Sequence, residues 1–228
     1  MTAAQRSLRL SLAQQAAVAR VAYALEKLPS VVLLCGPAGV GKTFVLKSVA
    51  DTAYLQPRLI AIWRCDELLE DMTRMGDLTA KQSVDRRQAD ILLIDDSHLL
   101  EDGQLSHLVD GCRKSHPSVG IVLAGEGRLL SLVSRDSRLE QLVRLRAILP
   151  PFSLAESSLL VAGSLVAAGS PENRAAVTRT IHEIAAGIPA LVMRLADLAE
   201  MLTSSNAGHV LVPDDIETLY RRLSLNAA

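Results

Sequence analysis

The chain has 228 residues and 49% of them are apolar, which is enough material for a buried core and excludes an intrinsically disordered chain. Aromatic residues make up only 3%, so the core must be built from Leu, Val, Ile and Ala, a composition typical of helices packed on a parallel sheet. The net charge of −1 argues against non-specific attraction to nucleic acid or anionic lipid, although it leaves a local basic patch open.

Residues 1–28 carry alanines and leucines at helical spacing, with Arg6, Arg9 and Arg20 ahead of the first acid, Glu26. Transit peptides share this composition, but the segment runs directly into the first predicted strand, so we expect a structural helix. Charges interrupt its apolar run, which excludes a secretory signal. No stretch of the chain reaches the roughly 18 uninterrupted apolar residues that cross a bilayer, so we expect no transmembrane segment.

A glycine-rich loop follows the apolar residues 31–34, which read as a buried strand. The loop is a complete P-loop: Gly36, Pro37, Ala38, Gly39, Val40, Gly41, Lys42 and Thr43. Its glycines let the backbone curl so that N–H groups point at phosphate oxygens, and the helix that starts near Lys42 and continues through Phe44 attracts the same phosphates. Lys42 should reach the β and γ phosphates, and the Thr43 hydroxyl should help to hold Mg²⁺. The motif predicts a site for a nucleoside triphosphate.

A second acidic motif lies about fifty residues later, where the apolar strand at residues 91–94 ends in Asp95 and Asp96. This is a Walker B arrangement, and the carboxyl ends of parallel strands meet at one edge of a sheet. We expect Asp95 to hold Mg²⁺, directly or through water, and Asp96 to orient the attacking water. A helix cap followed by a turn is the alternative reading of the Asp pair.

Three further strands are predicted at residues 59–63, 120–124 and 147–149, the last closed by Pro150 and Pro151. Strands that alternate with helical patterns specify an α/β fold, here a five-stranded parallel P-loop sheet flanked by helices. The strand at 120–124 should lie between the P-loop strand and the Walker B strand. Four helices complete the chain, at residues 154–168, 171–186, 189–203 and 213–223. The expected domains are an N-terminal helix (1–28), a nucleotide-binding core (29–151) and a helical lid (152–228).

Taken together, these motifs resemble the AAA+ ATPases over residues 25–223. More narrowly the chain is similar to the ExeA-type accessory ATPases of secretion and pilus systems and to related transposition ATPases, through residues 123–129, 149–153 and 187–189. The Asp-Asp form of the Walker B motif also resembles that of replication initiators and loaders, the ORC/DnaA-like group. The resemblance implies that the nucleotide is ATP.

The resemblance assigns roles to two more carboxylates. Asp96 stands where many of these ATPases have a glutamate, and a side chain one carbon shorter implies slow hydrolysis. The family places a sensor of the γ-phosphate after the fourth strand, where this chain has Glu126 beside glycines. A carboxylate there would repel phosphate unless it holds a water or a neighbouring arginine.

The resemblance also implies an arginine that reaches into the site of an adjacent subunit. Arg144 is the first candidate and Arg146 the second, since both precede the Pro150-Pro151 step. The family's lid motif usually has arginine where this chain has Ala190, and Arg194, one helical turn later, is the substitute. For each of these arginines, a solvated surface or an ion pair is the alternative.

The remaining polar and aromatic residues have simpler readings. Cys35, Cys65 and Cys112 are far apart and odd in number, which argues against a disulfide framework and a zinc site and points to the reducing cytoplasm. Cys35 reads as a small buried residue, with a redox role as the alternative. His98 reads as a surface or packing histidine, and Trp63 as a core or interface residue.

The sequence therefore predicts an AAA+ ATP-binding protein that hydrolyses ATP slowly, needs Mg²⁺ and assembles as a homo-oligomer or with other AAA+ subunits. It would act on a protein partner in a larger assembly. Two alternatives stay open: a nucleotide-gated adaptor or loader that binds DNA with little hydrolysis, and a scaffold subunit that depends on an active ATPase partner.

Overall fold

The computed structural model describes residues 10–52, 55, 57–67, 89–206 and 208–225. They form two compact units. The first contains Leu12–Pro37 and Gly41–Pro150, so the N-terminal helix belongs to the same unit as the sheet, and the second is formed mainly by Pro151–Ala228.

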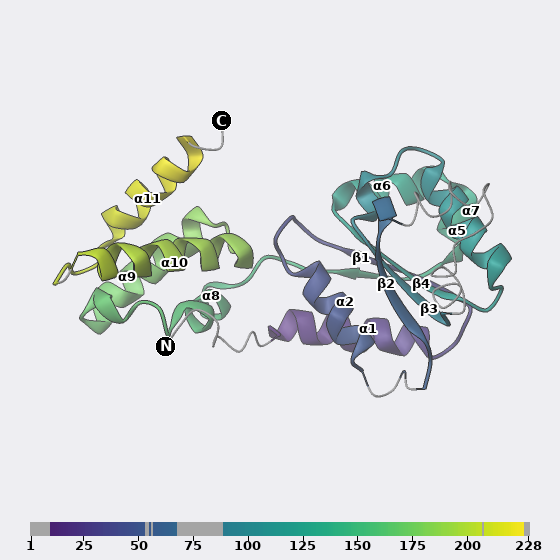
Figure 1. Ribbon diagram of the computed structural model, residues 1–228, viewed down its shortest axis with the longest axis horizontal. Coiled ribbons are helices and arrows are strands. Elements are labelled where there is room, and N and C mark those ends of the chain that lie inside the picture. The colour runs from purple at the N-terminus through teal and green to yellow at the C-terminus, as the bar shows by residue number, and fades with distance from the viewer. Residues whose placement is uncertain (1–9, 53–54, 56, 68–88, 207, 226–228) are drawn as a thin grey trace. The chain divides into compact units, whose positions relative to one another are not determined.

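The first unit contains a five-stranded sheet in which all neighbouring strands are parallel (Figure 1). The strands, in their order across the sheet, are β2 (Ile60–Arg64), β3 (Ile91–Asp95), β4 (Gly120–Gly125), β1 (Ser30–Cys35) and β5 (Val143–Ile148). The expected α/β class is confirmed, and so is the position of the fourth strand between the strands that carry the P-loop and the Walker B acids.

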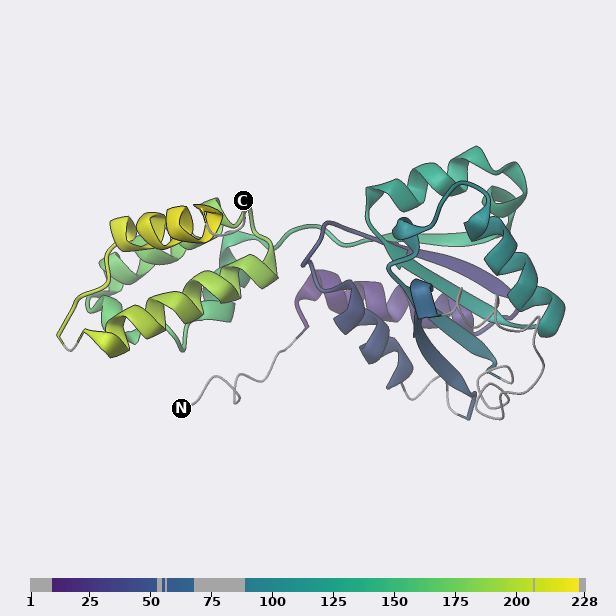
Figure 2. The ribbon, with the colours of Figure 1, turned by 45° about the horizontal axis from the view of Figure 1, so that its top comes forward.

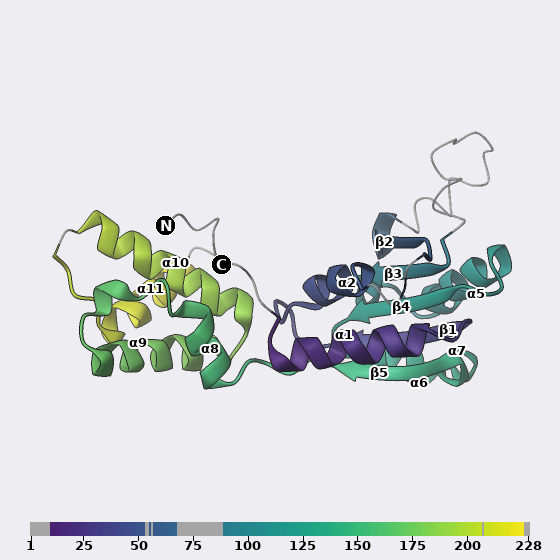
Figure 3. The ribbon, with the colours of Figure 1, turned by 90° about the horizontal axis from the view of Figure 1, so that it is seen from below.

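Helices cover both faces of this sheet (Figures 1 and 2). On one side lie α1 (Leu12–Leu25) and α2 (Lys42–Ala50), with α1 running beside β1 and β5 (Figure 3). On the other lie α5 (Gln104–Ser115), α6 (Gly127–Arg135) and α7 (Ser137–Leu142). Because both faces are covered, β1, β3 and β4 are buried throughout, which explains their continuous apolar sequences. Trp63 lies in the core, opposite Ile94 in the register, as expected for a packing residue.

The last strand differs from the prediction. β5 begins at Val143 rather than at residue 147, so Arg144 and Arg146 lie within the strand and not ahead of it. The physical reason is its edge position: outward side chains alternate with partly buried ones, and charges on alternate residues hide a strand from a search for apolar runs. In addition, the single helix predicted at residues 154–168 is α8 (Leu154–Val161) followed by the short 3₁₀ helix η4 (Val166–Ala168).

The second unit contains α8, α9 (Pro171–Ile184), α10 (Pro189–Ser205) and α11 (Pro213–Leu225) around a core of its own. Its helix starts follow their sequence signals. Ser153 and Glu156 form a capping box at α8, and Ser170 caps α9 ahead of Pro171.

Two stretches that carry the family resemblance meet within this second unit. The Phe152 N–H donates to the Gly187 carbonyl at 2.8 Å, and Gly187 has φ +69°. A Cβ on Gly187 would lie 2.3 Å from the Phe152 carbonyl oxygen, so only glycine permits this approach. Among the described residues, no helix is long and apolar enough to cross a membrane.

Candidate nucleotide-binding site

The two predicted nucleotide motifs meet at the carboxyl edge of the sheet. The P-loop follows β1, the Walker B acids end β3, and Glu126 follows β4, which lies between those two strands. The Gly36 N–H donates to the Gly125 carbonyl at 3.2 Å, which joins the first residue of the loop to the end of β4. The strand order therefore brings together residues that are up to about ninety positions apart in sequence.

The P-loop depends on glycine at its junction with α2. Gly41 is the N-cap of α2 and has φ +100°, a left-handed conformation that disfavours other residues. A Cβ at this position would lie 2.5 Å from Nε2 of Gln14, a buried side chain of α1. The Gln14 side chain of α1 therefore packs against the end of the P-loop, a contact that the sequence motif does not reveal.

Lys42 lies inside the curve of the P-loop. Its side chain is buried, and its ammonium donates to the carbonyls of Gly36 at 3.0 Å and Pro37 at 2.9 Å. Two of its three N–H groups are used in these bonds, so the positive charge is held beside the loop. This is the charge that the β and γ phosphates of a nucleotide require in a P-loop.

A hydrogen bond joins the P-loop to the Walker B strand. The Thr43 hydroxyl donates to Oδ2 of Asp95 at 2.5 Å, and Oδ1 of Asp95 accepts the Asp96 N–H at 2.9 Å. Asp95 is buried and therefore fixed in place. A hydroxyl and a carboxylate side by side are the hard oxygen ligands that Mg²⁺ takes together with phosphate oxygens, so these two residues fit the predicted ion.

Asp96 contacts residues at the end of β2, the strand that flanks β3 on the side away from β4. Its backbone is left-handed, with φ 56°, and its carboxylate lies 3.8 Å from the guanidinium of Arg64 at the end of β2. Its carbonyl accepts a hydrogen bond from the Cys65 thiol at 3.0 Å. Since β2 and β4 flank β3, these contacts hold Asp96 on the side of β3 away from the P-loop strand.

Glu126 has a partner that sequence reasoning missed. Its Oε1 lies 3.5 Å from Nε2 of His98, which is only 14% exposed and sits on η3 (Ser97–Leu99), directly after the Walker B acids. Arg128 donates to the His98 carbonyl at 2.9 Å. A Cβ on Gly125 would lie 3.0 Å from the His98 backbone nitrogen, so the ring packs closely on the end of β4. The neighbouring strands β3 and β4 thus exchange contacts through this pair; a histidine three residues after Asp95 is its only signal in the sequence.

The predicted arginines lie elsewhere. Arg144 is exposed on the edge strand β5 and donates to the Lys27 carbonyl at 3.2 Å. Arg146 forms an ion pair with Glu140. Arg194 is exposed on α10 in the second unit. Among the described residues, none of the three forms a hydrogen bond or ion pair with Lys42, Thr43, Asp95 or Asp96.

Cys35 is buried in the core beside the P-loop, as expected for a small packing residue. Burial raises the pKa of its thiol to about 11, and this effect outweighs the opposing influence of the nearby Lys42 charge. Cys65 and Cys112 are also free thiols whose pKa is raised by burial. Among the described residues, no group of histidine, cysteine and acidic side chains forms a separate metal cluster.

Known structures share this architecture. Domain III of the replication initiation protein DnaA from Thermotoga maritima is 18% identical, with a TM-score of 0.66 over 92% of this chain and 90% of that one. The Aeropyrum pernix ORC2 protein, solved as ADPNP and ADP complexes, is 14% identical, with a TM-score of 0.61 over 92% and 67%. The Aeropyrum pernix ORC1 protein in complex with DNA is 16% identical, with a TM-score of 0.62 over 92% and 65%.

No protein with a curated description matches the sequence. The model of the ATPase family associated with various cellular activities (AAA) matches residues 32–146, which run from β1 to β5 and include the P-loop, both Walker B acids and Glu126. The chain is therefore a member of the AAA family of ATPases.

Proposed function

We propose that this protein binds Mg-ATP at the carboxyl edge of its sheet and hydrolyses it to ADP and phosphate. The observation that carries the proposal is the Thr43–Asp95 hydrogen bond, which sets a hydroxyl beside a buried carboxylate directly after the P-loop lysine. In a bound complex, Mg²⁺ would neutralise charge on the phosphate oxygens. Lys42 would orient the β and γ phosphates, while Thr43 and Asp95 would hold the ion. The nucleotide complexes of ORC2 support ATP as the ligand.

Hydrolysis also needs a group that orients the attacking water, and two carboxylates compete for this role. Asp96 is the residue expected from the Walker B motif, but its contact with Arg64 draws it toward β2. Glu126 follows the strand between the P-loop and Asp95, and His98 fixes its direction. The position of Glu126 favours it as the alternative base. Either assignment predicts slow turnover. Asp96 is one carbon shorter than the usual Walker B glutamate, and Glu126 follows a different strand from that glutamate.

Phosphate release by the purified full chain tests this proposal. Lys42→Ala should abolish nucleotide binding, and removing the true water-orienting group should lower turnover by about 10²- to 10⁴-fold without loss of ATP affinity. Asp96→Asn and Glu126→Gln are compared directly, with Asp102→Asn, an exposed carboxylate paired with Arg135, as the control. Unchanged ATP binding in Lys42→Ala contradicts the assigned site. Tight binding with no turnover in the wild type excludes the ATPase and leaves a nucleotide-gated switch.

We further propose that the protein acts as an oligomer in the cytoplasm, with a nucleotide between subunits, and couples it to a protein partner. Arg144 is exposed and available to a neighbouring subunit, where an arginine finger contributes about 10³- to 10⁵-fold in turnover. Arg144→Ala and Asp95→Asn subunits should each lack activity alone, and mixing them should restore part of it. In the mixture, Arg144 of an Asp95→Asn subunit can reach the intact nucleotide site of an Arg144→Ala neighbour. Arg135→Ala, an exposed arginine paired with Asp102, is the control, and Arg146→Ala tests the second candidate in the same way. Failure of complementation contradicts the role of Arg144. Arg194→Ala tests the predicted lid contact by its ATP affinity.

A DNA-binding adaptor is the second candidate function, and a row of cations favours it. Arg20 donates to the Arg146 carbonyl, Arg144 to the Lys27 carbonyl, and Arg58 to the carbonyls that end α1. These contacts bring the side chains of Arg20, Arg58 and Arg144 to α1 and the edge of β5, where Lys27 and Arg146 also lie; among the described residues, Arg146–Glu140 is the one ion pair that involves any of the five. The DNA complex of ORC1 supports the comparison.

Salt-dependent binding of a fluorescent DNA duplex tests this candidate. Each lost phosphate contact should reduce the slope of log K against log salt by about 0.9. Arg20→Gln and Lys27→Gln are the informative variants, because neither residue is a candidate for the finger. A slope that is the same in both variants and in the wild type contradicts DNA binding along this row.

A further inference from the structure

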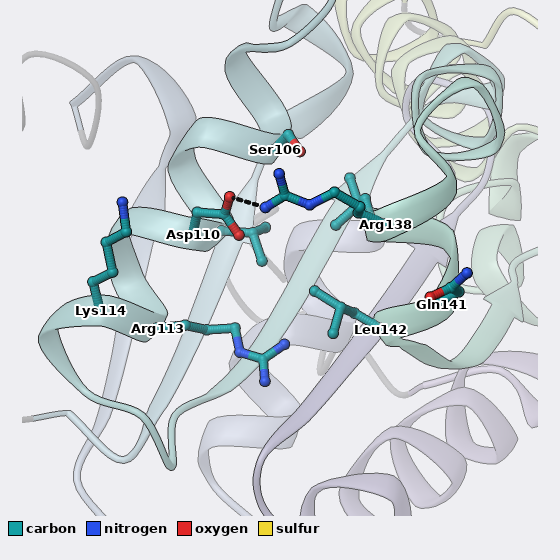
Figure 4. A pocket seen from close by; sticks show the side chains of 9 residues that line it. Ser106, Asp110, Arg113, Lys114, Arg138, Gln141 and Leu142 are labelled. Atoms are coloured by element: carbon teal, nitrogen blue, oxygen red, sulfur yellow. Dashed lines mark hydrogen bonds and ion pairs between the residues drawn. The ribbon is translucent and has the colours of Figure 1, made fainter.

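A hollow of about 600 Å³ lies between α5 and α7, on the unit that carries the sheet. Its lining residues are Ser106, Val109, Asp110, Arg113, Lys114, Arg138, Leu139, Gln141 and Leu142. Figure 4 shows the Arg113 guanidinium reaching into the space between the two helices, with Leu142 facing it from α7. A volume in this range is large enough to hold one or two side chains of another molecule.

The floor of the hollow is apolar and rigid. Val109 and Leu139 are buried members of the core under the sheet, and Leu142 packs against the same core. Val109 and Leu139 close the bottom of the hollow, and the partly exposed Leu142 is the apolar side chain that a ligand can contact there.

The acids around the hollow are already engaged. The Arg138 guanidinium donates to Asp110 at 2.7 Å, and Asp136, the N-cap of α7, accepts from the Ser106 hydroxyl and from two backbone N–H groups. Arg113 and Lys114 have no ion pair or hydrogen bond through their side chains to any described residue. Among the described residues, Arg113 and Lys114 are thus two cations at the rim of the hollow whose charges no acid pairs with.

Helix electrostatics explains only part of this arrangement. Arg113 and Lys114 lie in the last turn of α5, where cations favour the helix dipole, and that accounts for their sign. It does not account for the hollow, or for a half-buried guanidinium aimed across it toward α7. A half-buried arginine without a carboxylate partner is suited to bidentate recognition of one from another molecule.

The hollow is also remote from the nucleotide. Helix α5 starts after the Walker B turn and runs back along the sheet, and Leu142 directly precedes β5. Arg113, Lys114 and Leu142 thus lie toward the amino edge of the parallel sheet, whereas the P-loop and Asp95 lie at the carboxyl edge. The occupant is therefore a molecule other than ATP.

We propose that this hollow binds an acidic peptide segment of a partner protein, with an apolar side chain on the floor and a carboxylate on Arg113. The Lys114 ammonium donates to a second carboxylate of the segment. Nucleic acid fits less well, since the lining has no aromatic side chain for a base to stack on and the floor offers nothing to a phosphate. This proposal rests on the proposed function in one respect: it identifies where the protein partner proposed above would bind.

Fluorescence anisotropy with a labelled peptide of alternating glutamate and leucine tests the proposal on the full chain. Arg113→Gln should weaken binding by about tenfold or more, as expected for the loss of a charge-assisted contact. A peptide with glutamine in place of glutamate should bind more weakly by a similar factor. An all-glutamate peptide should also bind more weakly, because it has no apolar side chain to contact the floor. Arg135→Gln on α6, an exposed arginine paired with Asp102, is the matched control and should change binding less than about twofold.

Charge reversal strengthens the test. Arg113→Glu should prefer a lysine–leucine peptide to the acidic one, a switch that a merely unstable variant cannot produce. ATP affinity is measured in the same samples and should stay unchanged, so failure of the peptide site is distinguishable from failure of the nucleotide site. Equal peptide binding by the wild type and Arg113→Gln overturns the proposal. So does a DNA duplex that depends on Arg113 when the peptide does not, or no peptide binding by the wild type at about 1 mM.

Discussion

Replacing Gly41 by alanine tests the support that α1 gives to the P-loop. Gly41 has φ +100°, and the left-handed backbone costs an ordinary residue about 1–2 kcal/mol. The new Cβ would also lie 2.5 Å from Nε2 of Gln14, so that side chain must leave its position, at about 0.5–1.5 kcal/mol for a strained rotamer. The total is about 1.5–3.5 kcal/mol. Any part of this cost that is relieved by moving the loop appears as weaker nucleotide binding, up to about 300-fold at about 1.4 kcal/mol per decade.

The chain contains a matched control at a second left-handed helix N-cap. Gly103 begins α5 with φ +86°, and a Cβ there would meet nothing within 4 Å. Gly103→Ala should therefore show the backbone strain alone, with unchanged affinity for Mg-ATP. In the Gly41→Ala background, Gln14→Ala should recover about 2- to 10-fold of the lost affinity by removing the clash, whereas Gln14→Ala alone gives the reference.

Isothermal titration with a non-hydrolysable ATP analogue measures affinity, and urea unfolding measures stability. The reasoning is refuted if Gly41→Ala and Gly103→Ala lose equal stability and both keep the wild-type affinity. In that case the contact with Gln14 does not constrain the loop, and α1 is packing material only.

Three further outcomes are expected. Gly187→Ala and Gly169→Ala share φ +69°, but only the first meets a backbone carbonyl at 2.3 Å, so urea unfolding should show an extra loss of about 1–3 kcal/mol in Gly187→Ala; equal losses contradict the contact. Cys35, with its pKa near 11, should react with a thiol reagent at pH 8 about 100-fold more slowly than a free thiol; mass mapping that finds the free rate shows an accessible residue. Hydrogen bonds from Ser106 and the α7 backbone lower the pKa of Asp136, so its stabilising effect is full above the ordinary aspartate pKa and disappears as pH falls through the lowered value; the stability difference from Asp136→Ala should shrink between neutral and acidic pH, and a constant difference contradicts this.

The sequence predicts most of the fold because local signals agree with tertiary structure. Strands covered on both faces must be apolar throughout, so β1, β3 and β4 can be predicted from continuous apolar segments. The P-loop can be recognised in the sequence because its backbone conformation requires glycine, as at Gly41. β5 carries charged residues at alternate positions, so an apolar run is visible only near its end, and the strand begins at Val143 instead of at the predicted residue 147.

The parts of the site that sequence reasoning missed are contacts through space. Arg64 reaches Asp96 only because β2 neighbours β3, and Glu126 reaches His98 only because β4 neighbours β3 on its other side. Neither pair has a sequence spacing that a motif records. The sequence motifs identify the P-loop and Asp95, while the sheet order determines which neighbours Asp96 and Glu126 contact.

The position of Trp63 has a practical consequence. It is the single tryptophan of the chain and lies buried on β2, opposite Ile94, one residue before the Walker B acid. Indole emission therefore reports one location, next to the strand that carries Asp95, and carries no signal from the helical unit. A change in emission on mixing with nucleotide would be a label-free optical record of events at β2 and β3, and a second tryptophan placed in α10 would report on the helical unit against a known background.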